Sequence, residues 1–263
     1  TIFGCFGPVG QMYPGEDGGR AWGKDVSAGP HHLAPLGILT QKDSREINWI
    51  ASYLEDKWFL QAGHGDYSLK EVQENWFDLG GFYKIQPYYC RITELYARND
   101  DVKPFIRAYF NALPTLLSTE NLSLWEHFHN IGGWNKTHET GWFLAQTRLM
   151  YVMERGSDIW LAPFVTNHWM KDGMKVTVQN SQTRFGKVSY EIISKTSQGK
   201  IEAAINPPSR NDFNNIVLRL RHPEGKEIKS VKVNGRNHKN FNPQKDTITI
   251  NPGKREINVV ANY

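Results

Sequence analysis

The chain has 263 residues, of which 39% are hydrophobic and 22% charged, a composition typical of a folded protein with one or two cores. Its net charge of +4 is small, and its Lys and Arg residues form no stripe, which argues against a nucleic-acid partner. No run approaches the roughly 20 apolar residues of a membrane span. Thr1 is followed by no basic start or apolar signal core, as in a processed secreted protein or a piece of a longer polypeptide.

Tryptophan and cysteine give two further indications. All nine Trp residues precede residue 170, which suggests two regions with different roles. Carbohydrate-handling proteins often show such enrichment, because a flat indole matches the apolar face of a sugar ring. Cys5 and Cys90 could form one pair, but two cysteines specify neither a disulfide framework nor a metal site.

The first part of the chain predicts an irregular segment followed by helices. Residues 1–40 are rich in Gly and Pro and predict a long loop, either folded over a site or a loose end. Apolar residues then recur at helical spacing, with capping residues such as Ser44 and Ser68 and a proline start at Pro87. The predicted helices cover about 44–61, 68–82, 86–100, 101–117 and 139–155.

After residue 173 the pattern changes from helical spacing to alternation. Seven short stretches alternate polar and apolar residues and are separated by Gly, Pro, Asn and Asp, which predicts antiparallel strands in a β-sandwich. These stretches are 174–179, 186–194, 199–207, 215–223, 227–235, 246–252 and 255–263. The apolar segment 158–173 is expected to join the two parts firmly. The predicted fold class is therefore α + β and multidomain, with domains at 1–172 and 173–263.

The segment 121–146 has an unusual composition for a plain loop. It holds three Trp, three His and two Glu residues, and so much aromatic surface usually needs a pocket or a ligand. Its candidate residues are Trp125, Glu126, His127, His129, Trp134, His138, Glu139 and Trp142.

The order of these features resembles a known family. Helical hairpins, then "LSLWEHF" in a loop, then the helix "ETGWFLAQTRLMYV", then a sandwich with a "VKVNG" hairpin are similar to the end of the six-hairpin toroid glycoside hydrolases. The resemblance is greatest to the alpha-L-rhamnosidase group, although the loop continues differently after Trp125-Glu126. It implies a partial (α/α) toroid before the β-sandwich. Because a closed ring needs twelve helices, it also implies that this chain is the C-terminal portion of a longer enzyme, with the other hairpins upstream.

The resemblance implies an inverting glycoside hydrolase acting on a plant or microbial polysaccharide, with Glu126 as the catalytic base. Such hydrolysis needs two carboxyl groups, an acid for the leaving oxygen and a base for the water, and the acid is expected outside this chain. An exposed loop glutamate is the alternative for Glu126. Glu139 is better explained as a carboxylate at a helix N-terminus. The clustered histidines could suggest a metal, but their spacing is unspecific, and no metal or other cofactor is expected.

Substrate contacts are expected from aromatic and polar residues of two loops. Those nominated are Trp125, His127, His129 and Trp134 in the later loop and Asp17, Trp22, Asp25 and His31 in the first. The expected partner is a carbohydrate, without nucleic acid or a membrane span, and the expected location is secreted or periplasmic. A different class also fits, namely a non-catalytic carbohydrate-binding or structural module.

Overall fold

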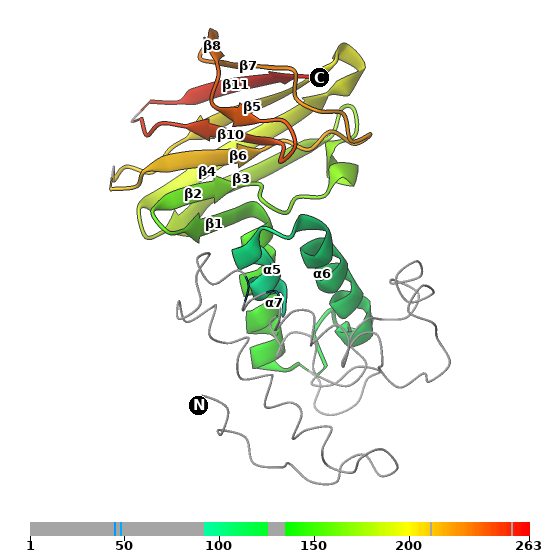
Figure 1. Cartoon of the computed structure of the whole chain (residues 1–263). Helices are drawn as coiled ribbons and strands as arrows, with labels where there is room; N and C mark the ends of the chain where they lie inside the picture. Colours follow the sequence, from blue (N-terminus) through cyan, green and yellow to red (C-terminus); the bar gives the residue numbers. More distant parts are fainter. Residues whose placement is uncertain (1–44, 46–47, 49–91, 126–134, 211, 254) are drawn as a thin grey trace. The chain divides into compact units, whose positions relative to one another are not determined.

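The computed structural model describes residues 92–125, 135–210, 212–253 and 255–263, together with Arg45 and Asn48. The chain divides into two compact units, Thr1–Gln146 and Thr147–Tyr263. Figure 1 shows helices in the first unit and mainly strands in the second. Of the helix predicted over 44–61, only Arg45 and Asn48 are described, and both are helical. The helix predicted over 68–82 lies outside the described residues.

Two antiparallel neighbours, α5 (Ile92–Asn99) and α6 (Val102–Leu116), form the described helical core of the first unit. The chain turns between them at Asp100, whose φ of 68° is left-handed, and the Asp101 amide donates to the Tyr96 carbonyl at 2.9 Å. Leu95 and Phe105 are fully buried. The helix prediction for 101–117 is confirmed, and that for 86–100 is confirmed from Ile92 onward.

Helix α7 (Thr137–Tyr151) agrees with the last predicted helix except at its end. Residues Val152–Arg155, predicted as helical, form strand β1, so that part of the prediction is wrong. The physical reason is a hairpin: β1 pairs with β2 (Asp158–Leu161) through a two-residue turn, and Gly156 takes a φ of 56° there. Glu154 of β1 is fixed by Arg148, whose guanidinium lies 2.9 Å from the carboxylate.

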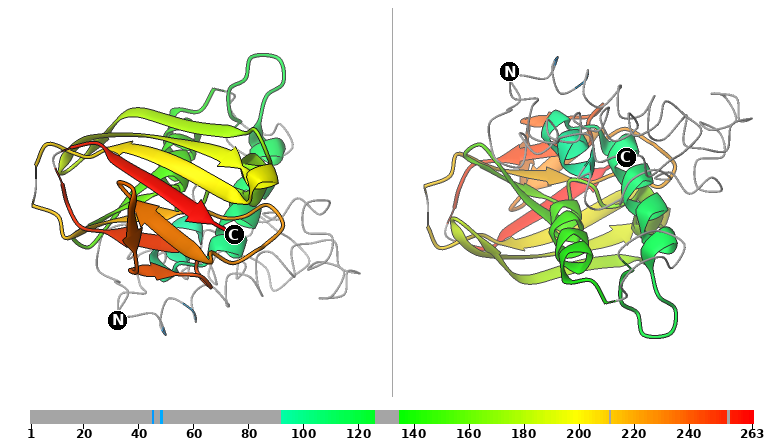
Figure 2. Two further views of the ribbon diagram at one scale, coloured as in Figure 1. Left: turned by 90° about the horizontal axis from the view of Figure 1, so that it is seen from above. Right: turned by 90° about the horizontal axis from the view of Figure 1, so that it is seen from below.

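The second unit contains two sheets, and all their pairs are antiparallel except β2–β6. The five-stranded sheet has the order β1–β2–β6–β10–β9, with β6 (Asn215–Arg219), β10 (Thr247–Ile250) and β9 (Phe241–Asn242). The six-stranded sheet has the order β3–β4–β5–β11–β7–β8. Its strands are β3 (Lys175–Thr183), β4 (Gly186–Lys195), β5 (Lys200–Asn206), β11 (Ile257–Asn262), β7 (Ser230–Val233) and β8 (Arg236–His238). Figure 2 shows β11 between β5 and β7.

The two sheets enclose one apolar core. Alternate residues of β4, β5 and β11 are buried, as the period of two in a strand requires. The core takes residues from both sheets, among them Ile216 and Ile248 from one and Ile192 and Ile205 from the other. All seven predicted strands are present, and the β-sandwich is confirmed. The helical toroid is not among the features that this structure shows.

Charged groups lie buried or half-buried near the end of β6, the central strand of the five-stranded sheet. Arg219 is 2% exposed, and its guanidinium donates to the Pro163 carbonyl at 2.7 Å and the Lys245 carbonyl at 3.1 Å. Just beyond β6, burial lowers the pKa of Arg221. Burial also raises the pKa of Asp246 to about 6, and the positive charges of Arg221 and Arg219 offset only part of that rise.

The raised pKa of Asp246 gives the stability of the fold a specific pH dependence. The folded chain binds this proton more tightly than the unfolded chain, so the stabilisation is complete below about pH 4 and is lost as the pH rises through about 6. Asp246→Asn cannot titrate. Its Tm should therefore rise relative to that of the parent chain between about pH 4 and about pH 7 in thermal melts.

Asp172→Asn is the matched control for this experiment. The Ser197 amide donates to the Asp172 carboxylate at 2.9 Å and holds the pKa of that carboxyl group below its usual value. The Tm of Asp172→Asn should therefore not rise relative to that of the parent chain over the same pH range. A constant Tm difference between Asp246→Asn and the parent would contradict the raised pKa of Asp246.

Candidate functional site

A tight turn after α6 precedes the loop that carries the predicted site. Leu117 and Leu124 form an antiparallel bridge, and the Ser118 amide donates to the Ser123 carbonyl at 2.8 Å. Within the turn, the Asn121 side-chain oxygen accepts from the Ser123 amide at 3.0 Å and from its hydroxyl at 2.6 Å. This side-chain turn fixes the backbone locally, as Asn typically does. Leu124 is thereby held in a defined position, with 3% of its surface exposed.

The far end of the loop returns to the same residue. The Lys136 amide donates to the Leu124 carbonyl at 3.0 Å, and α7 begins at Thr137. The Thr140 hydroxyl and amide both donate to the Lys136 carbonyl, at 2.9 and 3.1 Å, which ties this point to the first turn of the helix. Leu124 and Lys136, which lie on either side of the loop, are therefore held together. A loop whose ends meet in this way is a frequent setting for functional residues.

Of the residues proposed above as the catalytic base or as substrate contacts, Trp125 alone lies in the described part of the chain. It is half-buried. Its indole Nε1 is shielded from solvent and has no hydrogen-bond partner among the described residues. A buried donor without an acceptor costs about 1–3 kcal/mol. Such a group is energetically favourable only if packing elsewhere compensates, or if another group supplies an acceptor.

The buried face of α7 is polar at two positions. Glu139 is 0% exposed and Gln146 1%, and between them Phe143 stacks on Tyr109 with ring centroids 5.8 Å apart. Glu139 lies in the first turn of the helix, as expected from its sequence position. A carboxylate that only stabilises a helix N-terminus is usually exposed to solvent, so the complete burial of Glu139 is not explained by that role alone. Charged residues are rarely fully buried unless they are paired.

Gln146 was missed by the sequence reasoning. Its side-chain Nε2 is buried and has no hydrogen-bond partner within the described ranges. The signal was the spacing of Glu139, Phe143, Gln146 and Met150, which places all four on one helix face. Because two of these four residues are polar, the face does not stand out as an apolar stripe in the sequence. A helix that buries carboxylate and amide groups is typical of the lining of a polar interior.

The remaining nominated residues lie outside the described part of the chain. These are Asp17, Trp22, Asp25 and His31 in the first loop and Glu126, His127, His129 and Trp134 in the later one. Their roles stay predictions. Cys5 and Cys90 also lie outside it.

The described residues contain no group of three or more His, Cys, Asp or Glu side chains arranged to hold a metal ion. Within the same ranges, no helix has the length and hydropathy needed to cross a bilayer.

Comparisons with known proteins give a limited likeness. No protein-family model matches the chain, and no curated protein does. A solved structure titled "Glycoside hydrolase" aligns with a TM-score of 0.38 at 11% identity, over 67% of this chain and 31% of that one. The chain thus spans about a third of the length of that structure. At this TM-score the likeness assigns neither a family nor an activity to the chain.

Proposed function

We propose that the chain is the C-terminal portion of a glycoside hydrolase with an (α/α) toroid catalytic domain, secreted or periplasmic, acting on a plant or microbial polysaccharide. Glu126 is the catalytic base. The alpha-L-rhamnosidase group is the proposed relative, and the missing helical hairpins and the general acid belong to the upstream part of the polypeptide.

The observation that carries the proposal is the setting of Trp125. It directly precedes Glu126 in sequence, it is half-buried, and its indole N–H has no acceptor among the described residues. A sugar hydroxyl or a loop carboxylate would satisfy that donor, and an indole face suits the apolar side of a pyranose ring. The hydrogen bond from the Lys136 amide to the Leu124 carbonyl supports the same proposal, because it holds together the two ends of the segment that carries Glu126.

The polar face of α7 adds independent support. Glu139 and Gln146 lie on the buried side of the helix that directly follows the loop. A ring of helical hairpins needs polar groups on the faces that line its interior, where substrate hydroxyls bind. The burial of a carboxylate and an amide on one face of α7 is compatible with such a role for this helix.

The proposed chemistry follows from the needs of an inverting reaction. A base removes a proton from a water molecule on one face of the sugar while an acid protonates the leaving oxygen on the other. The two carboxyl groups must be roughly 6.5–9.5 Å apart, which leaves room for that water molecule. Glu126 would supply the base, and the neighbouring indole would exclude bulk water from one side of the carboxylate and raise its pKa toward a useful range.

The test is a hydrolysis screen of the complete polypeptide against aryl glycosides, including an aryl alpha-L-rhamnoside, and pectic oligosaccharides. We expect cleavage of at least one of them. Proton NMR of the first products should show the anomer opposite to that of the substrate. Binding of these sugars without any cleavage would favour the alternative class, a non-catalytic carbohydrate-binding module. A product with retained configuration would refute the role of Glu126 as a base.

A further inference from the structure

A pocket opens in the second unit where the chain passes from one sheet to the other. Its volume is about 530 Å³, within the roughly 300–1,000 Å³ of small-molecule sites. Its lining comes from the end of β10, from residues 251–253, 255 and 256 of the connection that follows it, and from β7, β8 and β11. The residues that matter for its chemistry are Val233, Asn234, His238, Ile250, Arg255 and Ile257. Both sheets therefore contribute to the pocket.

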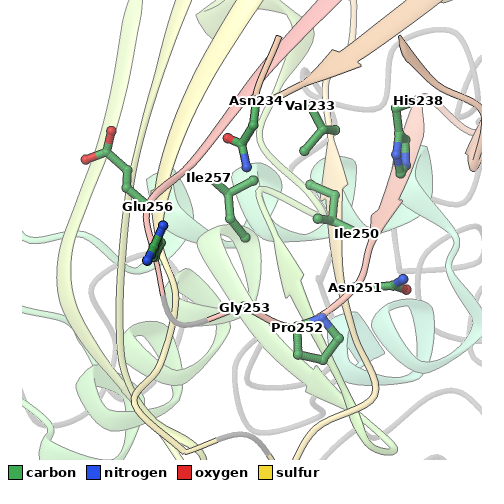
Figure 3. Close-up of a pocket in the computed structure, with 10 residues that line it drawn as sticks. Val233, Asn234, His238, Ile250, Asn251, Pro252, Gly253, Glu256 and Ile257 are labelled. Carbon is green, nitrogen blue, oxygen red and sulfur yellow. The ribbon is translucent and has the colours of Figure 1, made fainter. Parts of the chain in front are cut away.

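The pocket has an apolar floor and polar groups at its sides. Ile250 and Ile257 are 4% and 5% exposed and are part of the core, while Val233 is half-buried. Figure 3 shows these three side chains gathered between Asn234 and His238, with the Glu256 carboxylate pointing away from them. Apolar lining with a few placed polar groups is the usual composition of a small-molecule site.

Asn234 and His238 are held in defined orientations. The Asn258 amide donates to the Asn234 side-chain oxygen at 2.8 Å, which leaves the side-chain Nδ2 as the donor for a ligand. The His238 Nε2 lies 2.9 Å from the Thr249 carbonyl and 3.2 Å from the Asn240 carbonyl. Since a carbonyl only accepts, Nε2 carries the hydrogen, and Nδ1 is the nitrogen left for a ligand hydroxyl.

Arg255 supplies the charge at this pocket. It is exposed and forms no ion pair with any carboxylate in the described residues. Its neighbour Glu256 instead accepts from the Asn258 side chain at 3.3 Å. A guanidinium has a fork of donors that fits the two oxygens of a carboxylate.

The surrounding charge is also positive. Residues 230–262 contain six Lys and Arg against two Asp and Glu, a net charge of +4 that equals the net charge of the whole chain. Positive residues therefore outnumber negative ones in the segment that builds the pocket. A local excess of one sign attracts ligands of the other.

We infer that this pocket binds a saccharide unit bearing a carboxylate, that is, a uronic acid. Arg255 pairs with the carboxylate, Asn234 and His238 bind ring hydroxyls, and the Val and Ile side chains contact the apolar face of the sugar. The site lies in the sandwich and binds without cleaving. It would keep an acidic polysaccharide attached to the protein, and it can be measured whether or not the chain hydrolyses glycosides.

The test is isothermal titration calorimetry of the full chain with trigalacturonate and with its fully methyl-esterified form, which has the same sugars without charge. We expect trigalacturonate to bind, and the ester to bind at least about tenfold more weakly. Equal affinity for the two would overturn the assignment of a carboxylate. Failure of trigalacturonate to bind at all would overturn the proposal itself.

Two variants locate the binding. Arg255→Gln removes the guanidinium, and Asn234→Asp keeps the oxygen that accepts from Asn258 while replacing the donor by a negative charge. Each should weaken trigalacturonate binding about tenfold or more with an unchanged Tm. Lys187→Gln removes one positive charge from an exposed position outside the pocket and should leave the affinity nearly unchanged. Equal losses in Arg255→Gln and Lys187→Gln would show that only general electrostatic attraction is at work, and would overturn the site.

Discussion

Turnover should fall by roughly 10²–10⁴-fold when Glu126 is replaced by glutamine in the full-length polypeptide, because general-base catalysis contributes about that factor. Glutamine has nearly the same shape and keeps a hydrogen-bonding side chain, so the affinity for the sugar should change little. The result separates catalysis from binding. The measurement is kcat on the best substrate of the hydrolysis screen, together with the Kd of the unreactive variant for the same sugar.

Glu120→Gln is the matched control for this experiment. Glu120 is an exposed residue of the turn that precedes the same loop, six positions before Glu126, and its replacement should leave kcat unchanged. An unchanged kcat in Glu126→Gln would refute its role as the base. A loss of affinity that matches the loss of turnover would show instead that Glu126 binds substrate in the ground state.

Three of the strands that the sequence predicts correctly share a physical property. In β4, β5 and β11 one face is buried in the core and the other is more exposed. Apolar and polar residues therefore alternate along these strands, and the sequence shows this alternation. The sequence predicts helix for strand β1 because this strand has only four residues and continues directly from α7, so it is too short for a period of two to stand out. Its partner β2 is fixed by parallel pairing with β6, from Asp158 opposite Asn215 onward, across a long stretch of sequence. Local patterns cannot predict such distant pairing.

The candidate site is predictable to a smaller degree. The unusual composition of 121–146 directs attention to the loop that carries the candidate site, and the structure shows α7 after that loop. The burial of Gln146 and the indole N–H of Trp125 depends on neighbours that are distant in sequence, so no local signal reveals it. The pocket is a stronger example. Asn234, His238 and Arg255 are ordinary surface residues in sequence, and only the crossing of the chain between the sheets brings them together.

Arg219→Met is expected to destabilise the second unit by about 2–4 kcal/mol, the largest stability effect that we predict. Hydrogen bonds from a charged donor contribute about 1.5–3 kcal/mol each, and this side chain makes two of them to backbone carbonyls of Pro163 and Lys245. Its guanidinium also lies 5.4 Å from the centroid of the Trp160 ring. Methionine fills much of the volume, but it leaves the two carbonyl oxygens without these donors. Relief of the cost of burying the charge reduces the net effect below the sum of the bonds.

Urea unfolding followed by far-UV circular dichroism measures this effect, with the shift in midpoint read at constant slope. Arg236→Met is the matched control, because Arg236 is an exposed arginine in β8, and its replacement should change stability by less than about 0.5 kcal/mol. Arg219→Lys should lie between the parent and Arg219→Met, since an ammonium keeps the charge but cannot reach both carbonyls with a planar fork. If Arg219→Met were as stable as Arg236→Met, the buried guanidinium would contribute nothing net to the fold. Its hydrogen bonds would then only balance the cost of its desolvation.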